Sequence, residues 1–333
     1  FNVGHGDCFL VSKKNREFLL VDCGARFPGN HPSIPLVVEM ILHGSTPSHL
    51  VVSHYHYDHF SLLPEFALPS RILEKWYVPE IPHLGPGRQL GRAVMQFLMA
   101  ATISRFERYW ILAWLSRILG PPKALRKDMT IRGGGLSFDV LWPDLGSAIL
   151  GTDHIKRKAK NIHEILENIL RRLDLPIPDR DVPDDMSATE LFFESLPGIF
   201  ARANELDDEQ ISWIHERLTE LKDDFGFLAD RLSIAMETSR WSRSRILFLG
   251  DLPQRILDFL EGDLKYSSYG CIKAAHHGTE FGAALRDLST DYLLVSRSTR
   301  EFPPLKPVHH RYHDTLRYRD ILTTEIHGSC FIG

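Results

Sequence analysis

The sequence predicts an α/β fold in which strand-forming segments at both ends of the chain flank a helical middle. Short apolar runs separated by polar turns occupy about the first sixty residues and return after Leu232. Between them, apolar residues recur every three or four positions, which is the spacing of one helix face. The 333 residues are 43% hydrophobic, enough to bury a large core. We expect a single domain over residues 1–333, with helical insertions at about 87–127 and 151–230.

The N-terminal segments are predicted to form a hairpin followed by a helix and a buried strand. Apolar runs at 9–11 and 18–21 are joined by the polar stretch 13–16, which is typical of a turn. A helix is predicted over 34–42, and a strand over 50–53. A rigid strand in this position can hold the loop that follows it.

The middle of the chain should contain two helical blocks. The first block, at about 87–120, carries the aromatic residues Phe97, Phe106, Tyr109, Trp110 and Trp114. The second contains amphipathic segments at 162–173 and 211–221, joined by a loop at 176–185 that is rich in proline and aspartate. We expect the aromatic face of the first block to be buried against the second block or against a partner chain.

Strand patterns return on both sides of the second block. Two strands are predicted between Met129 and Pro143, and the later ones are at 232–237, 246–249, 272–275, 292–295 and 330–332. A short helix is predicted from Pro253 to Leu260. The predicted architecture is therefore two sheet halves separated in sequence by helices.

Bulk composition limits the classes of function. A net charge of -4 and a pI of about 6.5 give no global field that attracts a polyanion, so any nucleic-acid contact must use local patches. The four cysteines are far apart and form no CxxC pair, which is typical of reduced thiols in a cytoplasmic protein. The longest apolar stretch, 93–119, contains several charged residues, so we expect no membrane span.

A dense group of metal-ligand side chains follows the predicted strand at 50–53. His54, His56, Asp58 and His59 lie within six residues. Alternate side chains of an extended loop project to one side, so His54 and His56 can reach one ion. Imidazole and carboxylate groups suit zinc, and also manganese. This pattern favours a metal site over an ordinary polar surface loop.

Two later strand ends add further candidate ligands. Asp251 follows Gly250 at the end of an apolar strand, where an aspartate can also serve as a helix N-cap. His276 and His277 end another predicted strand, where a histidine can also be an ordinary core residue. Beside the histidine loop, we favour a metal-binding role for Asp251 and for one histidine of the pair.

The order of these segments resembles the metallo-β-lactamase superfamily, most closely its competence-protein branch, the DNA-uptake type of hydrolase domain. The segments that carry the resemblance are 2–7, 20–24, 54–59, 250–251, 276–278, 313–316 and the strand after Gly328. His5 stands where the branch usually has glutamine. The resemblance covers roughly the first eighty and the last hundred residues, and it does not extend to the helical middle.

The resemblance implies an αββα sandwich that carries two divalent metal ions, zinc in preference to manganese. By the same resemblance, His54 and His56 bind the first ion, Asp58, His59 and His277 bind the second, and Asp251 lies between them. His276 would then touch the substrate, although its assignment and that of His277 could be exchanged. A third histidine for the first ion would have to come from His154, His163 or His215, and the branch commonly lacks this ligand.

The resemblance favours a nuclease or phosphodiesterase that uses a hydroxide bound by two metal ions. Asp58 would orient this hydroxide, and His276 or His313 would stabilise developing charge or protonate the leaving oxygen. Basic residues that could hold neighbouring phosphates are Lys156, Arg157, Lys158, Lys160, Arg297, Arg300, Lys306, Arg311, Arg317 and Arg319. Such charge runs are also common on solvated surfaces.

Two other functions stay open from the sequence. One is a small-molecule hydrolase that acts on a thioester, a lactone or a phosphocholine-like ester, since the fold alone does not choose among these substrates. The other is an effector or interaction domain of a larger assembly, such as an anti-phage system, that binds a protein partner or a second copy through its helical insertions.

Overall fold

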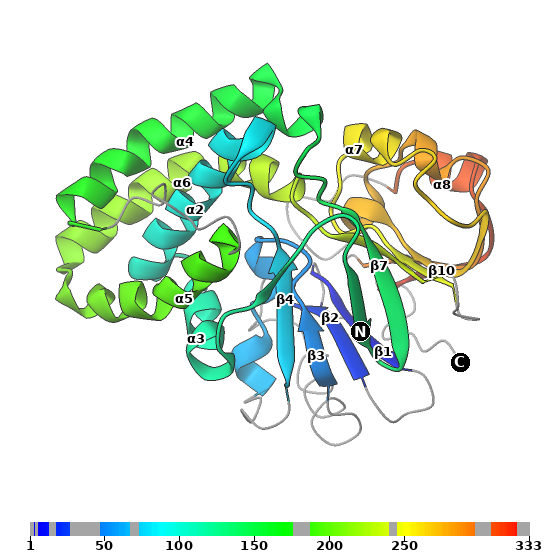
Figure 1. The fold of residues 1–333 in the computed structure, drawn as a ribbon, viewed down its shortest axis with the longest axis horizontal. Coiled ribbons are helices and arrows are strands. Elements are labelled where there is room, and N and C mark those ends of the chain that lie inside the picture. Colours follow the sequence, from blue (N-terminus) through cyan, green and yellow to red (C-terminus); the bar gives the residue numbers. More distant parts are fainter. Residues whose placement is uncertain are drawn as a thin grey trace. The chain divides into compact units, whose positions relative to one another are not determined.

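The structure is a computed structural model that describes residues 3, 6–12, 18–26, 47–66, 73–175, 187–239, 245–296 and 308–324. Its contacts divide the chain into two compact units (Figure 1). Unit 1 comprises Phe1–Pro79, Leu125–Pro143 and Ser233–Gly333, and unit 2 comprises Glu80–Ala124 and Asp144–Leu232. The single domain expected over residues 1–333 stays a prediction. The helix expected at 34–42, the turn at 13–16, the loop at 176–185 and the strand at 330–332 lie outside the described residues.

Within the described part of the chain, five strands form the first sheet, in the order β1-β2-β3-β4-β5. Their bounds are Cys8–Ser12, Phe18–Cys23, Pro47–Val51, Lys75–Pro79 and Lys123–Leu125. The predicted hairpin is present, because β1 pairs antiparallel with β2. The strand β3 pairs in parallel with both β2 and β4, so the carboxyl ends of these strands lie at one edge.

Seven strands of the described ranges form the second sheet, in the order β12-β11-β10-β9-β8-β7-β6. In chain order from β6 to β12, their bounds are Thr130–Gly133, Leu136–Trp142, Ala235–Thr238, Ile246–Phe248, Ser268–Lys273, Ser289–Val295 and Arg317–Thr323. Neighbours from β9 to β12 pair in parallel, whereas those from β6 to β9 pair antiparallel. The short helices α7 (Gln254–Phe259) and α8 (Arg311–Asp314) also belong to unit 1 (Figure 1).

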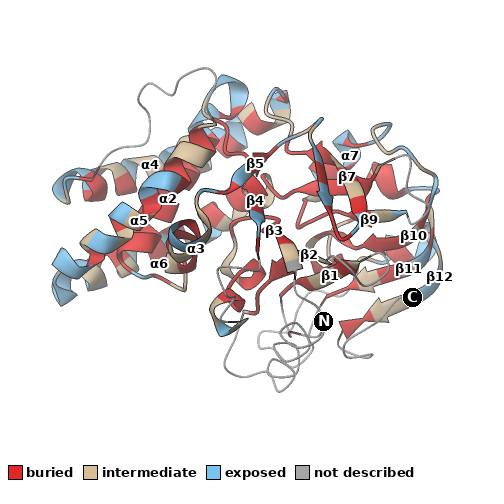
Figure 2. Cartoon of the chain, turned by 60° about the horizontal axis from the view of Figure 1, so that its bottom comes forward, coloured by how far each residue is buried: buried red, intermediate tan, exposed pale blue. Residues whose placement is uncertain are grey.

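The core of unit 1 lies between these two sheets. Side chains from both sheets form one buried cluster, which includes Leu19, Val21 and Val51 from the first sheet and Phe138 and Met236 from the second. From Leu136 to Val140 the strand β7 alternates buried and partly buried residues, as expected for a strand with one face on the core. Most of the strands are buried in Figure 2. The predicted fold class is confirmed: two packed sheets and helices form a mixed α/β structure consistent with the metallo-β-lactamase fold.

In the described residues, five α-helices make up most of unit 2, in the segments where helices were predicted. They are α2 (Arg88–Ile103), α3 (Trp110–Leu119), α4 (Asp153–Arg172), α5 (Ala188–Ala201) and α6 (Asp208–Asp230). The aromatic residues of the first insertion pack on the second. The ring of Phe97 stacks on Phe225 with centroids 3.9 Å apart, and Trp110 stacks on Phe200 at 6.3 Å.

The helical period of the first insertion does not reveal a break between α2 and α3. Arg105, Glu107 and Arg108 adopt left-handed backbone conformations there, with φ of 56°, 47° and 84°. Non-glycine residues hold this conformation only where their surroundings favour it. Two such contacts come from the second insertion, since Arg105 donates to Asn204 and Lys222 pairs with Glu107. The break therefore depends on tertiary contacts.

None of the helices in the described part of the chain has the length and apolar composition needed to cross a membrane.

Candidate metal centre

The candidate ligands lie at the carboxyl ends of strands in unit 1. The loop with His54 and His59 follows β3, Asp251 follows β9, and His277 follows β10. In open α/β sheets this edge is the usual place for a ligand. The sheet topology thus gathers into one site side chains that are about 220 residues apart in the sequence.

Close backbone contacts hold the first loops of the site together. The Asp7 amide donates to the Asp58 carbonyl at 3.4 Å, and the Gly24 amide donates to the Asp7 carbonyl at 3.0 Å. A Cβ atom at Gly24 would lie 2.3 Å from the Asp58 carbonyl oxygen, so only glycine permits this approach. The backbone of segment 22–24 therefore packs closely against the histidine loop and holds it in place.

The turn that carries His276 and His277 is strained. Both residues have positive φ, 45° and 53°, and the His276 amide donates to the Gly250 carbonyl at 3.1 Å. Strain of this kind in a non-glycine pair is typical of functional sites. The His277 Nδ1 atom lies 2.8 Å from the Ser296 carbonyl oxygen, so it must donate to it. This bond leaves Nε2 of the neutral ring with its lone pair toward the site.

Three imidazoles face a single oxygen of Asp251. The Oδ2 atom lies 3.3 Å from His277 Nε2, 3.6 Å from His59 Nε2 and 3.9 Å from His54 Nε2. All four residues are buried. The ligand atoms of His54, His59 and Asp251 lie within 4.8 Å of one another, which is close enough for one ion to bind all three.

The other two predicted ligands join the same cluster. Asp58 Oδ2 lies 3.9 Å from His277 Nε2, and Asp58, His59 and His277 form a second group that could hold an ion. His56 Nδ1 lies 3.0 Å from His54 Nε2. The structure thus brings together His54, His56, Asp58, His59, Asp251 and His277.

One buried nitrogen in this cluster has no hydrogen-bond partner. His59 Nδ1 lies 3.0 Å from Asp22 Oδ2, whereas the buried Nε2 atom makes no hydrogen bond. A carboxylate on the far nitrogen is the usual arrangement behind a metal-binding histidine. A nitrogen left unpaired in the interior costs free energy unless something binds it. The donor set therefore fits a divalent ion of the zinc type.

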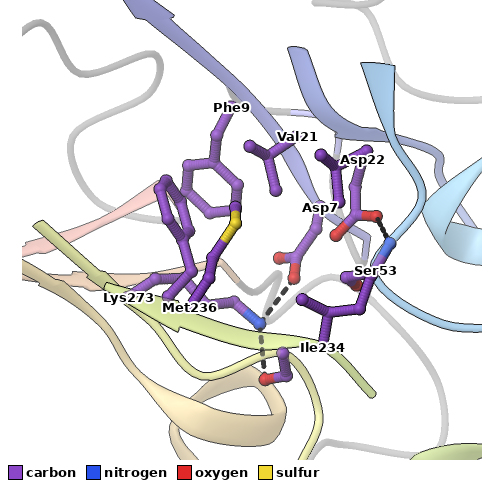
Figure 3. A pocket seen from close by; sticks show the side chains of 11 residues that line it. Asp7, Phe9, Val21, Asp22, Ser53, Ile234, Met236 and Lys273 are labelled. Carbon is purple, nitrogen blue, oxygen red and sulfur yellow. Dashed lines mark hydrogen bonds and ion pairs between the residues drawn. The ribbon is translucent and has the colours of Figure 1, made fainter. Parts of the chain in front are cut away.

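The sequence did not single out three charged residues that support the cluster, namely Asp7, Asp22 and Lys273. Asp22 accepts from the Ser53 amide at 2.6 Å and from His59. The Lys273 ammonium lies 2.6 Å from Asp7 Oδ2 and 3.1 Å from Asp251 Oδ1, and Figure 3 shows it pointing toward Asp7. Asp7 and Asp22 lie within segments that carry the family resemblance, so the sequence could have indicated them. No sequence pattern indicated Lys273, because it is a single lysine at the end of a strand.

Burial and charge divide the histidines into two classes. Burial lowers the pKa of His54 and brings that of His56 to about 4, so both are neutral at pH 7 and can donate a lone pair. Burial also acts to lower the pKa of His59 and His277. For these two the nearby carboxylates outweigh it, chiefly Asp22 for His59 and Asp251 for His277, so that their pKa is raised.

Metal binding should therefore release protons and strengthen as the pH rises. His59 and His277 retain a proton above the ordinary histidine pKa in the metal-free protein, and an ion must displace it. Their contribution to the stability of the metal-free protein is present below that value and is lost as the pH rises through the folded pKa. We expect the zinc-induced increase in Tm to grow from about pH 6 to about pH 8. An increase that shrinks over this range would contradict the assignment.

The two remaining predicted site residues are His276 and His313. His276 is next to His277, with ring centroids 6.1 Å apart, and burial lowers its pKa. His313 is exposed on α8 and its Nδ1 lies 2.8 Å from the Tyr318 hydroxyl. Among the described residues, His313 belongs to no group that could hold an ion.

The histidines considered as a third ligand of the first ion have contacts within unit 2. His163 contacts Gln96 and Glu167, His215 lies 2.7 Å from the Ser104 carbonyl oxygen, and His154 packs on Phe227. Within the described part of the chain, none of the three belongs to an ion-binding group.

A family model matches the N-terminal part of the chain. Residues 1–155 match the family model described as "Metallo-beta-lactamase superfamily". This superfamily consists mostly of hydrolases and generally binds divalent metal ions, often zinc. The matched residues include the histidine loop, whereas Asp251 and His277 lie beyond them and join the site through the fold. No curated protein matches the chain.

Proposed function

We propose that the protein is a metal-dependent phosphodiesterase that cleaves nucleic acid. The observation that carries the metal-dependent part is the convergence of three imidazole Nε2 atoms on Asp251 Oδ2, at 3.3 to 3.9 Å. One of these atoms, in His59, is buried without a hydrogen bond. Such an arrangement has no evident structural purpose, since an apolar side chain would be more stable there than a buried imidazole nitrogen without a hydrogen bond.

The six clustered residues divide naturally between two ions. His54 and His56 would hold the first, and Asp58, His59 and His277 the second, with Asp251 between the two groups. Zinc suits these nitrogen and oxygen donors best, and manganese is the alternative. When bound, such ions lower the pKa of a water molecule and neutralise charge that develops on a phosphoryl group.

The side chains of the protein have separate tasks in this proposal. Asp58 accepts a hydrogen bond from the attacking water and so orients it. Asp22 and the Ser296 carbonyl hold the tautomers of His59 and His277 through their Nδ1 atoms. His276, neutral because burial lowers its pKa, or His313 stabilises the charge on the leaving oxygen.

Two observations support a nucleic-acid substrate. The segments at 2–7 and 20–24 resemble the DNA-uptake branch, and Lys156 and Arg157 are exposed on α4. Lys158 pairs with Asp224, and Lys160 lies 3.4 Å from Glu164, so these two charges are partly neutralised. Arg297, Arg300 and Lys306 lie outside the described residues. The basic contact is therefore assigned first to Lys156 and Arg157.

The double substitution Lys156→Ala/Arg157→Ala should weaken binding of single-stranded DNA without abolishing cleavage. Each lost phosphate contact reduces the slope of log K against log salt by about 0.7, so the pair should reduce it by about 1.4. Fluorescence anisotropy at several salt concentrations measures this slope. Lys160→Ala is the matched control on the same helix, because Lys160 is exposed but paired with Glu164. An unchanged slope in the double variant would remove α4 from the DNA-binding surface.

The decisive experiment combines metal analysis with a substrate panel. Purified protein should bind divalent metal and cleave at least one of single-stranded DNA, duplex DNA, RNA or a small phosphodiester. Brisk cleavage of a thioester or lactone with every nucleic acid intact would replace the proposal with a small-molecule hydrolase. A protein that binds metal but cleaves nothing in the panel would instead support an effector or interaction domain. Failure to bind any divalent ion would refute the metal-dependent function itself.

A further inference from the structure

A lysine side chain is buried within the candidate metal centre. Lys273 is the last residue of β10, and its side chain is 2% exposed. Lysine is almost never buried to this extent unless it is paired. Its neighbours in the strand, Ile272 and Cys271, are ordinary core residues. The ammonium therefore requires an explanation from the groups around it.

The Lys273 ammonium donates hydrogen bonds to Gly250 and Asp251 and forms an ion pair with Asp7. Nζ lies 2.6 Å from Asp7 Oδ2, 3.0 Å from the Gly250 carbonyl oxygen and 3.1 Å from Asp251 Oδ1. An ammonium has three donors and no acceptor, so oxygens are the partners it requires. The position of Nζ is thus fixed by two carboxylates and one backbone carbonyl from different parts of the chain.

The space beside the ammonium leaves little room for water that would compete for these contacts. The cavity beside the ammonium has a volume of about 10 Å³, and its polar lining includes Asp7, Asp22 and Ser53 (Figure 3). A cavity of that size holds about one water molecule. The rest of the lining is apolar, with Phe9 and Met236 among its residues. In such surroundings the ion pair is poorly screened, so it constrains the carboxylates firmly.

The two oxygens of Asp251 consequently face different groups. Oδ1 contacts the Lys273 ammonium, whereas Oδ2 faces His277, His59 and His54. We propose that Lys273, with Asp7 as its counter-ion, is a positioning residue that holds Asp251 so that only Oδ2 coordinates metal. This inference rests on the proposed metal-dependent function, because it concerns how one of the proposed ligands binds.

Asp251 would coordinate differently without this lysine. A free carboxylate can rotate and offer both oxygens to one ion, which raises the coordination number of that ion. A lysine with a purely structural role would need only Asp7, which already neutralises it at 2.6 Å. The additional contacts with Gly250 and Asp251 link it to the segment that carries the metal ligand.

The test uses cobalt(II) as the probe, since its visible absorption reports coordination number and geometry. The double variant Asp7→Asn/Lys273→Met removes one negative and one positive charge, so the net charge of the site equals that of the parent. The ammonium's contacts with Asp251 Oδ1 and with the Gly250 carbonyl oxygen are lost in addition. We expect an absorption band of lower intensity and cobalt affinity about 10- to 100-fold weaker, as for other residues that orient metal ligands. The single variant Asp7→Asn retains Lys273 and should keep the parental spectrum.

Lys127→Met is the matched control for loss of a paired lysine. Lys127 lies in the same unit and pairs with Asp263 at 2.9 Å, so this variant should keep the parental cobalt spectrum and affinity. A parental spectrum in the double variant, or an equal change in Asp7→Asn, would overturn the inference. A parent protein that binds no cobalt would instead refute the proposed function. If the double variant does not fold, Lys273→Arg keeps the charge in a different geometry, and a parental spectrum there overturns the inference.

Discussion

Replacement of Asp58 by alanine should abolish hydrolysis of nucleic acid and leave binding nearly unchanged. Asp58 approaches His277 Nε2 at 3.9 Å inside the cluster and is also the proposed group that orients water. A carboxylate in this role stabilises the transition state by several kcal/mol, so its loss lowers kcat by on the order of 10³-fold or more. The phosphates are held by basic side chains elsewhere, so Kd for uncleaved DNA should change little. Single-turnover cleavage and anisotropy measure the two quantities separately.

Asp291→Ala provides the control for this substitution. Asp291 is an exposed aspartate on β11 in the same unit, so its loss should alter neither cleavage nor binding. If Asp58→Ala cleaves as fast as the parent protein, the role of Asp58 in the reaction is wrong. Equal loss of cleavage and binding would instead mean that Asp58 holds the substrate.

Replacement of Phe138 by alanine should lower the free energy of unfolding by about 3–5 kcal/mol. Phe138 is fully buried in the cluster between the two sheets, and its ring lies 6.3 Å from that of Phe248. The truncation removes apolar contacts and leaves a cavity that close-packed neighbours fill only in part. Urea unfolding followed by circular dichroism measures the change through the midpoint and the slope.

Phe259→Ala is the matched control, because Phe259 is 46% exposed beside Trp142. Much of its ring is already in water, so the loss should be less than half of that for Phe138. Similar losses for both variants would show that Phe138 does not lie in the main core. The comparison thus tests the packing of the two sheets directly.

The residues of the histidine loop could be predicted as ligands from the sequence because they are neighbours along the chain. His54, His56, Asp58 and His59 lie within six consecutive positions, so chain geometry alone keeps them close. Asp251 and His277 were also predicted, because each follows an apolar strand and belongs to a recognisable segment. The α/β class was predicted because apolar residues alternate in some segments, as they do in strands. In other segments they recur every three or four positions, as they do in helices.

The supporting residues and the break in the first insertion depended on tertiary contacts. Lys273 becomes part of the site only because β10 lies beside β9 and brings its ammonium to Asp251 and Asp7. Arg105 and Glu107 leave the helical conformation where partners from distant segments hold them. Local periodicity determines which segments become strands and helices, and where the ligand loops begin. Which charges meet in the interior is decided by strand order, because a buried charge is stable only where the fold brings it a partner.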